Sequence, residues 1–176
     1  MKKFELTTDT KMFLGRKLFR IKALISFGNV KAGDMGGYIE KEENLSQSGN
    51  AWVSGNAEVS GNAWVSGDAK VSGDAKVYGD AEVYGNAEVY GNAKVYGDAE
   101  VSGNADYATA SGFGSEYRTT TFFKLKNSDE IGVRCGCFYG TLKEFKEKVK
   151  ETHGESKKAK EYLMLADLME YRFSEE

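Results

Sequence analysis

Few side chains in this 176-residue chain could support acid–base, nucleophilic or metal chemistry. The one histidine, His153, stands in a Thr-His-Gly segment at a predicted helix end, and the two cysteines, Cys135 and Cys137, are one residue apart. A zinc site needs more ligands than Cys-x-Cys supplies, and a disulfide between these two would be strained. No HExxH, GxSxG or Walker motif is present. We therefore expect free structural thiols, no catalytic residue, no metal and no cofactor.

Four aspartates, Asp68, Asp74, Asp80 and Asp98, occupy one position of a six-residue repeat that runs from Gly49 to Ala108. The ten hexads, 60 residues in all, are GNAWVS, GNAEVS, GNAWVS, GDAKVS, GDAKVY, GDAEVY, GNAEVY, GNAKVY, GDAEVS and GNADYA. Position three is always Ala, and position five is Val except at Tyr107. Because side chains alternate across a strand, Ala and Val share one face, and positions four and six share the other. Glycine and Asn or Asp supply the bend that follows.

Each hexad thus predicts a short strand and a corner, and one strand cannot bury its Ala and Val alone. Three hexads per coil, stacked at roughly 4.8 Å, predict a triangular β-solenoid with valine inside. In such a stack Asp80 lies over Asp98, but Asp68 lies over Asn86, so the carboxylates give little support for a cation site.

The flanking segments predict caps at both ends of the solenoid, which would otherwise expose unpaired backbone. Residues 1–37 alternate as strands around Gly15 and predict an N-terminal β cap. The solenoid is expected over residues 38–114, extended by Tyr38, Ile39 and Leu45 before the repeat and by Phe113 after it.

Residues 115–176 predict a C-terminal ββαα domain. A hairpin is expected around residues 127–129, and a helix from Thr141, with Glu144 completing a capping box, to Gly154. A second helix follows. The apolar residues at helical spacing are Leu142, Phe145 and Val149 in the first helix and Ala159, Tyr162, Leu163, Ala166, Met169 and Phe173 in the second. We interpret both stripes as core.

The repeat resembles the left-handed parallel β-helix of hexapeptide-repeat proteins, and the left hand follows from this resemblance alone. The family pairs an aliphatic residue with a small one four places on, as Val53 with Ala57. The family's glycine usually follows the aliphatic residue directly, whereas here Ser or Tyr intervenes. The segments FRIKALISFGNVKAGDMGGYIEKEENLSQSGNAWV and TFFKLKNSDEIGVRCGCFYGTLKEFKEKVKETHG resemble uncharacterised phage and prophage proteins of this repeat class. That likeness implies a phage or prophage protein. Since the first residues contain no apolar signal segment and free thiols suit a reducing compartment, we expect the protein in the cytoplasm of its bacterial host.

Many hexapeptide-repeat proteins are acyltransferases, which use a histidine base between subunits and a loop that interrupts the coils. Here His153 lies outside the repeat, and no insertion breaks the ten hexads. A general base must reach the group that it deprotonates. Acyltransferase activity is therefore the least favoured hypothesis.

Aromatic residues mark the most distinctive surface of the repeat. Position six carries Tyr78, Tyr84, Tyr90 and Tyr96 where the earlier hexads carry serine, and position four carries Trp52 and Trp64. The first three tyrosines are expected on three successive faces, pointing outward, with the fourth stacked above the first. The tryptophans are expected beneath the N-terminal cap.

Three interpretations of this tyrosine belt stay open. The rings could stabilise neighbouring coils, form a homo-oligomer interface, or bind another protein or a nucleotide base. The resemblance favours a trimer for the second. The repeat holds three basic and nine acidic residues, which disfavours nucleic acid, since phosphates are bound mainly by Lys and Arg. No apolar run is long enough to span a membrane.

We hypothesise a non-catalytic phage-type protein that inhibits a host defence system by occluding a host protein with its belt and acidic prism. The alternative is a sponge for a nucleotide immune signal, with phosphate bound near Arg16, Lys17 and Arg20. A purely structural scaffold is a third possibility.

Overall fold

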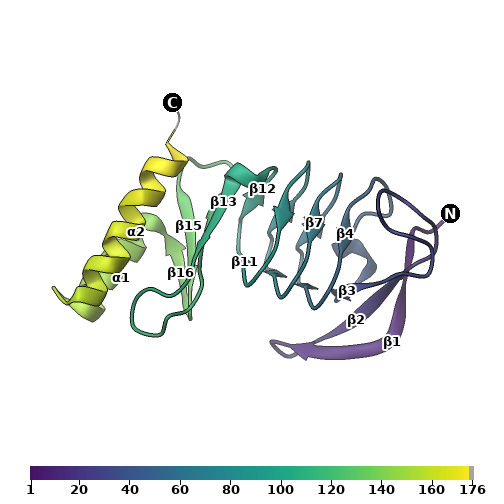
Figure 1. Ribbon diagram of the computed structural model, residues 1–176, viewed down its shortest axis with the longest axis horizontal. Coiled ribbons are helices and arrows are strands. Elements are labelled where there is room, and N and C mark those ends of the chain that lie inside the picture. The colour runs from purple at the N-terminus through teal and green to yellow at the C-terminus, as the bar shows by residue number, and fades with distance from the viewer. Residues whose placement is uncertain (175–176) are drawn as a thin grey trace.

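The computed structural model describes residues 1–174 and is an elongated molecule (Figure 1). A hairpin lies at the N-terminal end, the repeat forms the middle, and a sheet with two helices forms the other end. The repeat winds into a parallel β-solenoid of about four turns, as the sequence predicts.

The solenoid strands are two residues long and occupy positions four and five of their hexads. They are β4 (Trp52–Val53), β5 (Glu58–Val59), β6 (Trp64–Val65), β7 (Lys70–Val71), β8 (Lys76–Val77), β9 (Glu82–Val83), β10 (Glu88–Val89), β11 (Lys94–Val95) and β12 (Glu100–Val101). Residues one coil apart pair in parallel, as Val53 with Val71 and Val71 with Val89. We name the three sheets the β4 face (β4, β7, β10), the β5 face (β5, β8, β11) and the β6 face (β6, β9, β12).

The apolar positions of the repeat form one continuous core. From Ala51 to Val101, the alanines of position three and the valines of position five are at most 1% exposed. A fully buried valine contributes roughly 1.5 kcal/mol or more relative to an exposed one. The predicted arrangement, with valine inside, is confirmed.

The corners between strands depend on glycine. From Gly49 to Gly97, the first residue of each hexad has a φ between 61° and 75°, a region that glycine enters without steric cost. Most of these glycines also touch the next coil. A Cβ on Gly85 would overlap the backbone oxygen of Ser102, whereas a Cβ on Gly91 would meet no atom within 4 Å.

An N-terminal hairpin extends the β5 face. β1 (Phe4–Phe13) and β2 (Arg16–Ala23) pair antiparallel, and β3 (Met35–Ile39) joins β2 to β5. Ile39 pairs with Val59, Leu45 bridges to Val65, and both are buried. The predicted extension of the apolar column before the repeat is therefore confirmed at these two residues.

Side chains satisfy the carbonyl oxygens that the first coils present toward the N-terminal end. Asn44, which ends the short 3₁₀ helix η1 (Glu42–Asn44), donates to the carbonyls of Gly61 at 3.1 Å and Ala63 at 2.8 Å. The ammonium of Lys3, only 1% exposed, donates to the Ala51 carbonyl at 2.9 Å. Lys3 makes no ion pair within residues 1–174, and burial lowers its pKa to about 8.

The tenth hexad leaves the repeat pattern. Its residues form the 3₁₀ helix η2 (Asn104–Asp106) and begin β13 (Tyr107–Ala110), which pairs antiparallel with β14 (Thr120–Lys124). Asn104 accepts the Glu88 N–H at 2.8 Å, and the Tyr107 hydroxyl donates to the Glu88 carbonyl at 2.6 Å. These two side chains make the hydrogen bonds to the Glu88 backbone that a further coil would otherwise make. Phe113 is 42% exposed, so its predicted place in the valine column is wrong, because the chain has already entered the antiparallel sheet.

A four-stranded antiparallel sheet closes the C-terminal end of the solenoid. Its order is β13-β14-β15-β16, with β15 (Ile131–Cys135) and β16 (Phe138–Thr141), and the predicted hairpin is β14–β15. Neighbouring residues of β14 point to opposite faces. Phe123 joins the solenoid core, and Phe122 joins the core beneath the helices. The sheet therefore packs on both faces.

The two predicted helices are α1 (Leu142–His153) and α2 (Lys157–Phe173). The capping box is present, since the Thr141 hydroxyl accepts the Glu144 N–H at 3.3 Å and the Glu144 carboxylate accepts the Thr141 N–H at 2.7 Å. The predicted stripes form the core between the helices and the sheet. Neither helix has the length and apolar composition of a membrane-crossing segment.

We expect Gly85→Ala to destabilise the fold more than Gly91→Ala. Both positions have φ near +60°, so both alanines carry a similar conformational cost of about 1 kcal/mol. Only Gly85 adds an overlap with the next coil. Urea unfolding would measure both free energies. Equal losses would show that the close approach of the coils at Gly85 is not limiting.

We expect Lys3 to make the stability of the fold depend on alkaline pH. The pKa of Lys3 is about 8 in the folded state against 10.5 for a free lysine, so the unfolded chain binds more protons between these values. The Lys3 contribution to the free energy of unfolding therefore rises as pH increases through this window. Wild type should gain stability relative to Lys3→Met between pH 7 and pH 10, as measured by urea unfolding. A constant difference between the two proteins would contradict the prediction.

Candidate functional site

Tyr78 and Tyr96 lie one above the other on the β5 face, as predicted, with ring centroids 4.4 Å apart. Other parts of the chain cover them. Phe13, at the tip of the N-terminal hairpin, packs edge-on against Tyr78 at 5.4 Å, and Arg134 of β15 donates to the Tyr78 hydroxyl at 3.0 Å. Tyr139 of β16 packs against Tyr96 at 4.7 Å.

The prediction that Tyr78 points into solvent is therefore wrong. Its side chain is 6% exposed, because the hairpin and the C-terminal sheet meet over it. Burial raises the pKa of the Tyr78 phenol, and the neighbouring Arg134 acts in the opposite direction. Tyr78 and Tyr96 join the two ends of the molecule to the solenoid.

The tryptophans and Tyr84 have separate environments. On the β6 face, half-buried Tyr84 donates to the Glu100 carboxylate, a hydrogen bond that raises the pKa of the phenol, and Trp64 is 44% exposed. On the β4 face, Trp52 is 7% exposed and packs edge-on against Phe27 at 5.4 Å. The predicted cover of the tryptophans by the N-terminal segment is confirmed for Trp52 and wrong for Trp64.

Tyr90 is the most exposed tyrosine of the predicted belt. Its side chain is 62% exposed on the β4 face, and its ring meets that of Tyr107 edge-on at 6.5 Å. The four tyrosines therefore do not form one continuous surface: two join chain segments, one bonds a carboxylate, and Tyr90 faces solvent.

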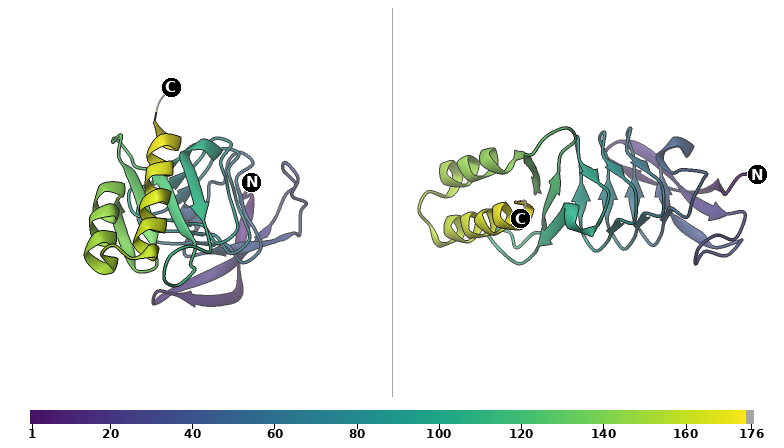
Figure 2. Two further views of the ribbon diagram at one scale, coloured as in Figure 1. Left: turned by 60° about the vertical axis from the view of Figure 1, so that its left-hand side comes forward. Right: turned by 90° about the horizontal axis from the view of Figure 1, so that it is seen from above.

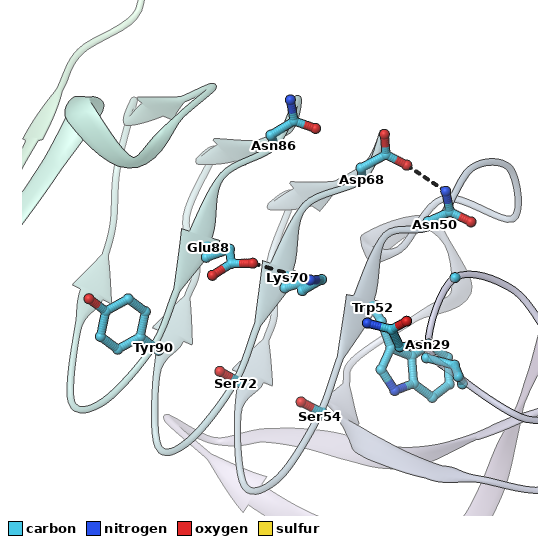
Figure 3. Close-up of a pocket in the computed structure, with 12 residues that line it drawn as sticks. Asn29, Asn50, Trp52, Ser54, Asp68, Lys70, Ser72, Asn86, Glu88 and Tyr90 are labelled. Carbon is cyan, nitrogen blue, oxygen red and sulfur yellow. Dashed lines mark hydrogen bonds and ion pairs between the residues drawn. The ribbon is translucent and has the colours of Figure 1, made fainter.

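Tyr90 borders a groove of about 550 Å³ that runs over the β4 face. Its residues are Gly28, Asn29, Val30, Asn50, Trp52, Ser54, Asp68, Lys70, Ser72, Asn86, Glu88 and Tyr90. Figure 3 shows Trp52 beside Asn29 at one end and Tyr90 at the other, with Lys70 and Glu88 between them. The strands β4, β7 and β10 form its floor.

The polar residues of the groove are paired across the coils. Asn50 donates to Asp68 at 2.8 Å, and Lys70 forms an ion pair with Glu88 at 3.1 Å, one coil apart in each case. Both partners of the ion pair are about half exposed, so solvent screening keeps the pair weak. A ligand could therefore exchange these partners at little cost. The groove contains one cationic side chain, Lys70, and two carboxylates, Asp68 and Glu88.

Sequence reasoning missed this groove as a unit. The 18-residue spacing that placed Tyr96 over Tyr78 also places Asp68 beside Asn50 and Glu88 beside Lys70. The loop that borders the groove beside Trp52 could not be found in this way. Residues 28–30 come from the N-terminal loop, where Phe27 and Val30 bridge, and no repeat relates them to the coils.

The predicted phosphate-binding residues do not converge. Arg16 pairs with Glu40, with contacts of 2.9 and 3.1 Å, and Arg20 contacts Asp9 at 3.4 Å. Lys17 follows Arg16 in β2 and so points to the opposite face, where its ammonium lies 5.5 Å from the Phe19 ring centroid.

Arg16 does line a second groove, of about 340 Å³, together with Lys41, Tyr78 and Tyr96. Here one predicted phosphate-binding residue and two of the predicted aromatic residues meet. The Glu40 carboxylate, however, already offsets the charge of Arg16.

The histidine and the two cysteines lie in the C-terminal domain, away from the groove on the β4 face. The His153 ring stacks on Tyr162 with centroids 5.9 Å apart, Cys135 is a half-buried free thiol, and Cys137 is an exposed one. Within residues 1–174, no three His, Cys, Asp or Glu side chains are grouped closely enough to hold a metal ion.

The chain matches no protein-family model and no curated protein. The resemblance to phage hexapeptide-repeat proteins thus stays a prediction.

We expect Tyr78→Ser to destabilise the fold by about 3 kcal/mol, in the range for removing a buried aromatic ring. Tyr90→Ser should cost less than about 1 kcal/mol, since the ring is exposed and serine occupies position six one and two coils earlier on the same face, at Ser72 and Ser54. Thermal and urea unfolding of both variants would measure this. Similar losses in the two variants would mean that Tyr78 does not join the ends of the molecule.

Proposed function

We propose that this protein is a non-catalytic inhibitor of phage or prophage type, which acts in the bacterial cytoplasm by occluding a host defence protein. The observation that carries the binding role is the groove on the β4 face. The phage setting comes from the sequence resemblance of both ends of the chain, the defence target is a working hypothesis, and the molecular role comes from the groove.

The β4 face is the best docking face of the solenoid on geometric grounds. The β5 face is covered by the N-terminal hairpin and by β15, which meet at Tyr78. The β6 face is contacted by the C-terminal domain, where Lys126 pairs with Glu82 at 2.8 Å. The groove on the β4 face stays open and has a stiff floor of stacked strands, so a partner loses little free energy in ordering it.

The groove combines features of a protein-binding surface. Exposed Tyr90, directly after β10, offers a large ring and a hydroxyl, and tyrosine is enriched among the residues that dominate binding energy. The repeat carries an excess of acidic residues, which would attract a basic surface of the partner and speed association. His153 lies outside the groove, so the proposal includes no general base at this site.

A nucleotide sponge is a second candidate, favoured by the groove that contains Arg16, Lys41, Tyr78 and Tyr96. Its rings could contact a base, and its two cations a phosphate. Release of Arg16 from Glu40 would be required, which makes this site weaker than the groove on the β4 face. Nucleotide that stays bound through purification would be detected as excess absorbance near 260 nm.

The test is capture of a host protein by tagged wild type, Tyr90→Ser and Trp64→Lys. Each variant replaces an exposed aromatic residue by one that the repeat itself uses at that position, on the β4 face and the β6 face respectively. We expect wild type and Trp64→Lys to capture the same host protein and Tyr90→Ser to lose it. With the purified partner, calorimetry should show binding at least about tenfold weaker for Tyr90→Ser.

Equal affinities of wild type and Tyr90→Ser would remove the β4 face from the proposal. Restored activity of the captured defence protein in the presence of Tyr90→Ser would support inhibition by occlusion. A captured protein that stays fully active when saturated with wild type would contradict it.

A further inference from the structure

A pocket of about 180 Å³ lies in the C-terminal domain, between the β15–β16 turn and α1. Both cysteines of the chain and its one histidine line it, together with Arg118 and Lys148. We name it the thiol pocket. The two helices lie at the end of the molecule opposite the N-terminal hairpin (Figure 2), and the thiol pocket shares no residue with the groove on the β4 face.

The turn between β15 and β16 holds Cys137 at the edge of the thiol pocket. Cys135 ends β15 and pairs with Phe138, which begins β16, so Gly136 and Cys137 form the turn. Gly136 has a φ of 57°, as the first position of the favoured two-residue hairpin turns requires. A turn fixed by paired strands on both sides leaves the backbone of Cys137 little freedom, and its thiol is free and exposed.

Cys135 has a different environment. It is half buried and packs against the core beneath the helices. The Thr120 hydroxyl donates to its sulfur at 3.1 Å. Since the thiolate is the nucleophilic form of cysteine and must be reached by its reagent, Cys137 is the thiol of the pair that a ligand can attack or be attacked by.

A guanidinium lies against the same turn because Gly136 has no side chain. A Cβ at this position would lie 2.9 Å from the Nη1 atom of Arg118, closer than van der Waals contact allows. Arg118 is thus held beside the residue that precedes Cys137, and Lys148 of α1 borders the same space. Among the residues that line the pocket in the described part of the chain, none is an aspartate or a glutamate.

Each of the two cations has a carboxylate neighbour outside the pocket. Arg118 is 3.8 Å from Glu116, and Lys148 is 3.0 Å from Glu151. All four side chains are more than half exposed, so solvent screening keeps these ion pairs weak. An anion inside the pocket meets the two cations directly, whereas the two carboxylates do not line the space that it occupies.

We propose that the thiol pocket binds a small organic disulfide with carboxylate groups, and that Cys137 undergoes thiol–disulfide exchange with it. Arg118 and Lys148 attract the carboxylates, and the rings of Phe138 and Phe145 contact the carbon chain. The pocket is smaller than the sites of about 300–1,000 Å³ that bind drug-sized ligands, so the disulfide is a short one. The proposal is independent of the groove on the β4 face.

The exchange needs no oxidant besides the disulfide itself. The Cys137 thiol loses its proton to water, and its sulfur attacks one sulfur of the disulfide. A new S–S bond to Cys137 forms as the S–S bond of the reagent breaks, and the departing thiolate takes up a proton. Cys137 is oxidised to a mixed disulfide, and one half of the reagent is reduced to its thiol.

The first experiment locates the modification. Reduced protein is treated with dithiodipropionate, a disulfide with two carboxylates, and its intact mass and peptide masses are measured. Wild type and Cys135→Ser should each gain one thiopropionate group, and Cys137→Ser should gain none. An unmodified wild type would overturn the proposal, and so would modification of Cys135 in place of Cys137.

The second experiment measures selection by charge. The rate of modification of Cys137 is compared for dithiodipropionate, for neutral hydroxyethyl disulfide and for cationic cystamine. Each rate is divided by the rate of the same reagent with the amide of N-acetylcysteine, because the leaving thiols differ in reactivity. After this division, wild type should react about tenfold faster with the anionic reagent than with the neutral one, and slowest with cystamine.

A pair of matched variants assigns this selection to the pocket. Arg118→Gln/Lys148→Gln should react with all three reagents at similar normalised rates. The control Lys143→Gln/Lys150→Gln removes the same charge from exposed positions of α1 outside the pocket, and it should keep the wild-type order. Circular dichroism melting would verify that the variants are folded.

Three results would contradict charge selection by the thiol pocket. Equal normalised rates in wild type would show that the pocket does not distinguish the reagents. A preference that survives Arg118→Gln/Lys148→Gln would show that these two cations do not bind the carboxylates. A preference lost equally in Lys143→Gln/Lys150→Gln would assign the effect to the net charge of the domain.

Discussion

The backbone hydrogen-bond ladder between coils is the constraint on which the rest of this structure depends. The N–H of the position-four residue donates to the alanine carbonyl one coil later, as Trp52 to Ala69 at 3.0 Å and Lys70 to Ala87 at 2.9 Å. The ladder works only if the chain turns a corner after every hexad, and glycine makes this turn possible at positive φ. Ala and Val then fill the interior, while positions two, four and six are free to vary. The groove on the β4 face is built entirely from those variable positions and one loop.

Each edge of a parallel ladder exposes both N–H groups and carbonyl oxygens, and side chains satisfy both kinds of group at the two ends of the solenoid. At the N-terminal end, the Asn44 amide and the buried Lys3 ammonium donate to carbonyls, and the Glu40 carboxylate accepts the Gly61 N–H at 2.6 Å. At the C-terminal end, the Asn104 side chain accepts the Glu88 N–H, and the Tyr107 hydroxyl donates to the Glu88 carbonyl. The non-repeating segments thus satisfy backbone groups of the end that they close. These segments also extend over the β5 face and cover it, whereas the β4 face stays open.

Most of the solenoid could be predicted from the sequence because its contacts repeat. The spacing of Val and Ala indicates which residues are inside, and one coil of offset places Tyr96 over Tyr78. The burial of Tyr78 could not be predicted, since it depends on Phe13 and Arg134, which are far away in sequence and belong to no repeat. The loop that borders the groove could not be predicted for the same reason. The place of Phe113 was misread because periodicity alone does not reveal that Tyr107 has begun an antiparallel strand.

Because each coil has three faces, the repeat can lengthen or shorten without changing the face of later residues only in steps of one whole coil. A duplication or deletion of one whole coil, 18 residues as in the Asn50–Asp68 step, lengthens or shortens the rod but returns every later residue to its original face. Gain or loss of a single hexad instead shifts every later residue to the next face, and the C-terminal domain turns with it by a third of a revolution. Arg134 would then no longer meet Tyr78 beside the N-terminal hairpin. Changes in repeat number by threes therefore keep each end of the molecule on its own face, although each such step also moves Arg134 by one coil along the β5 face relative to the hairpin.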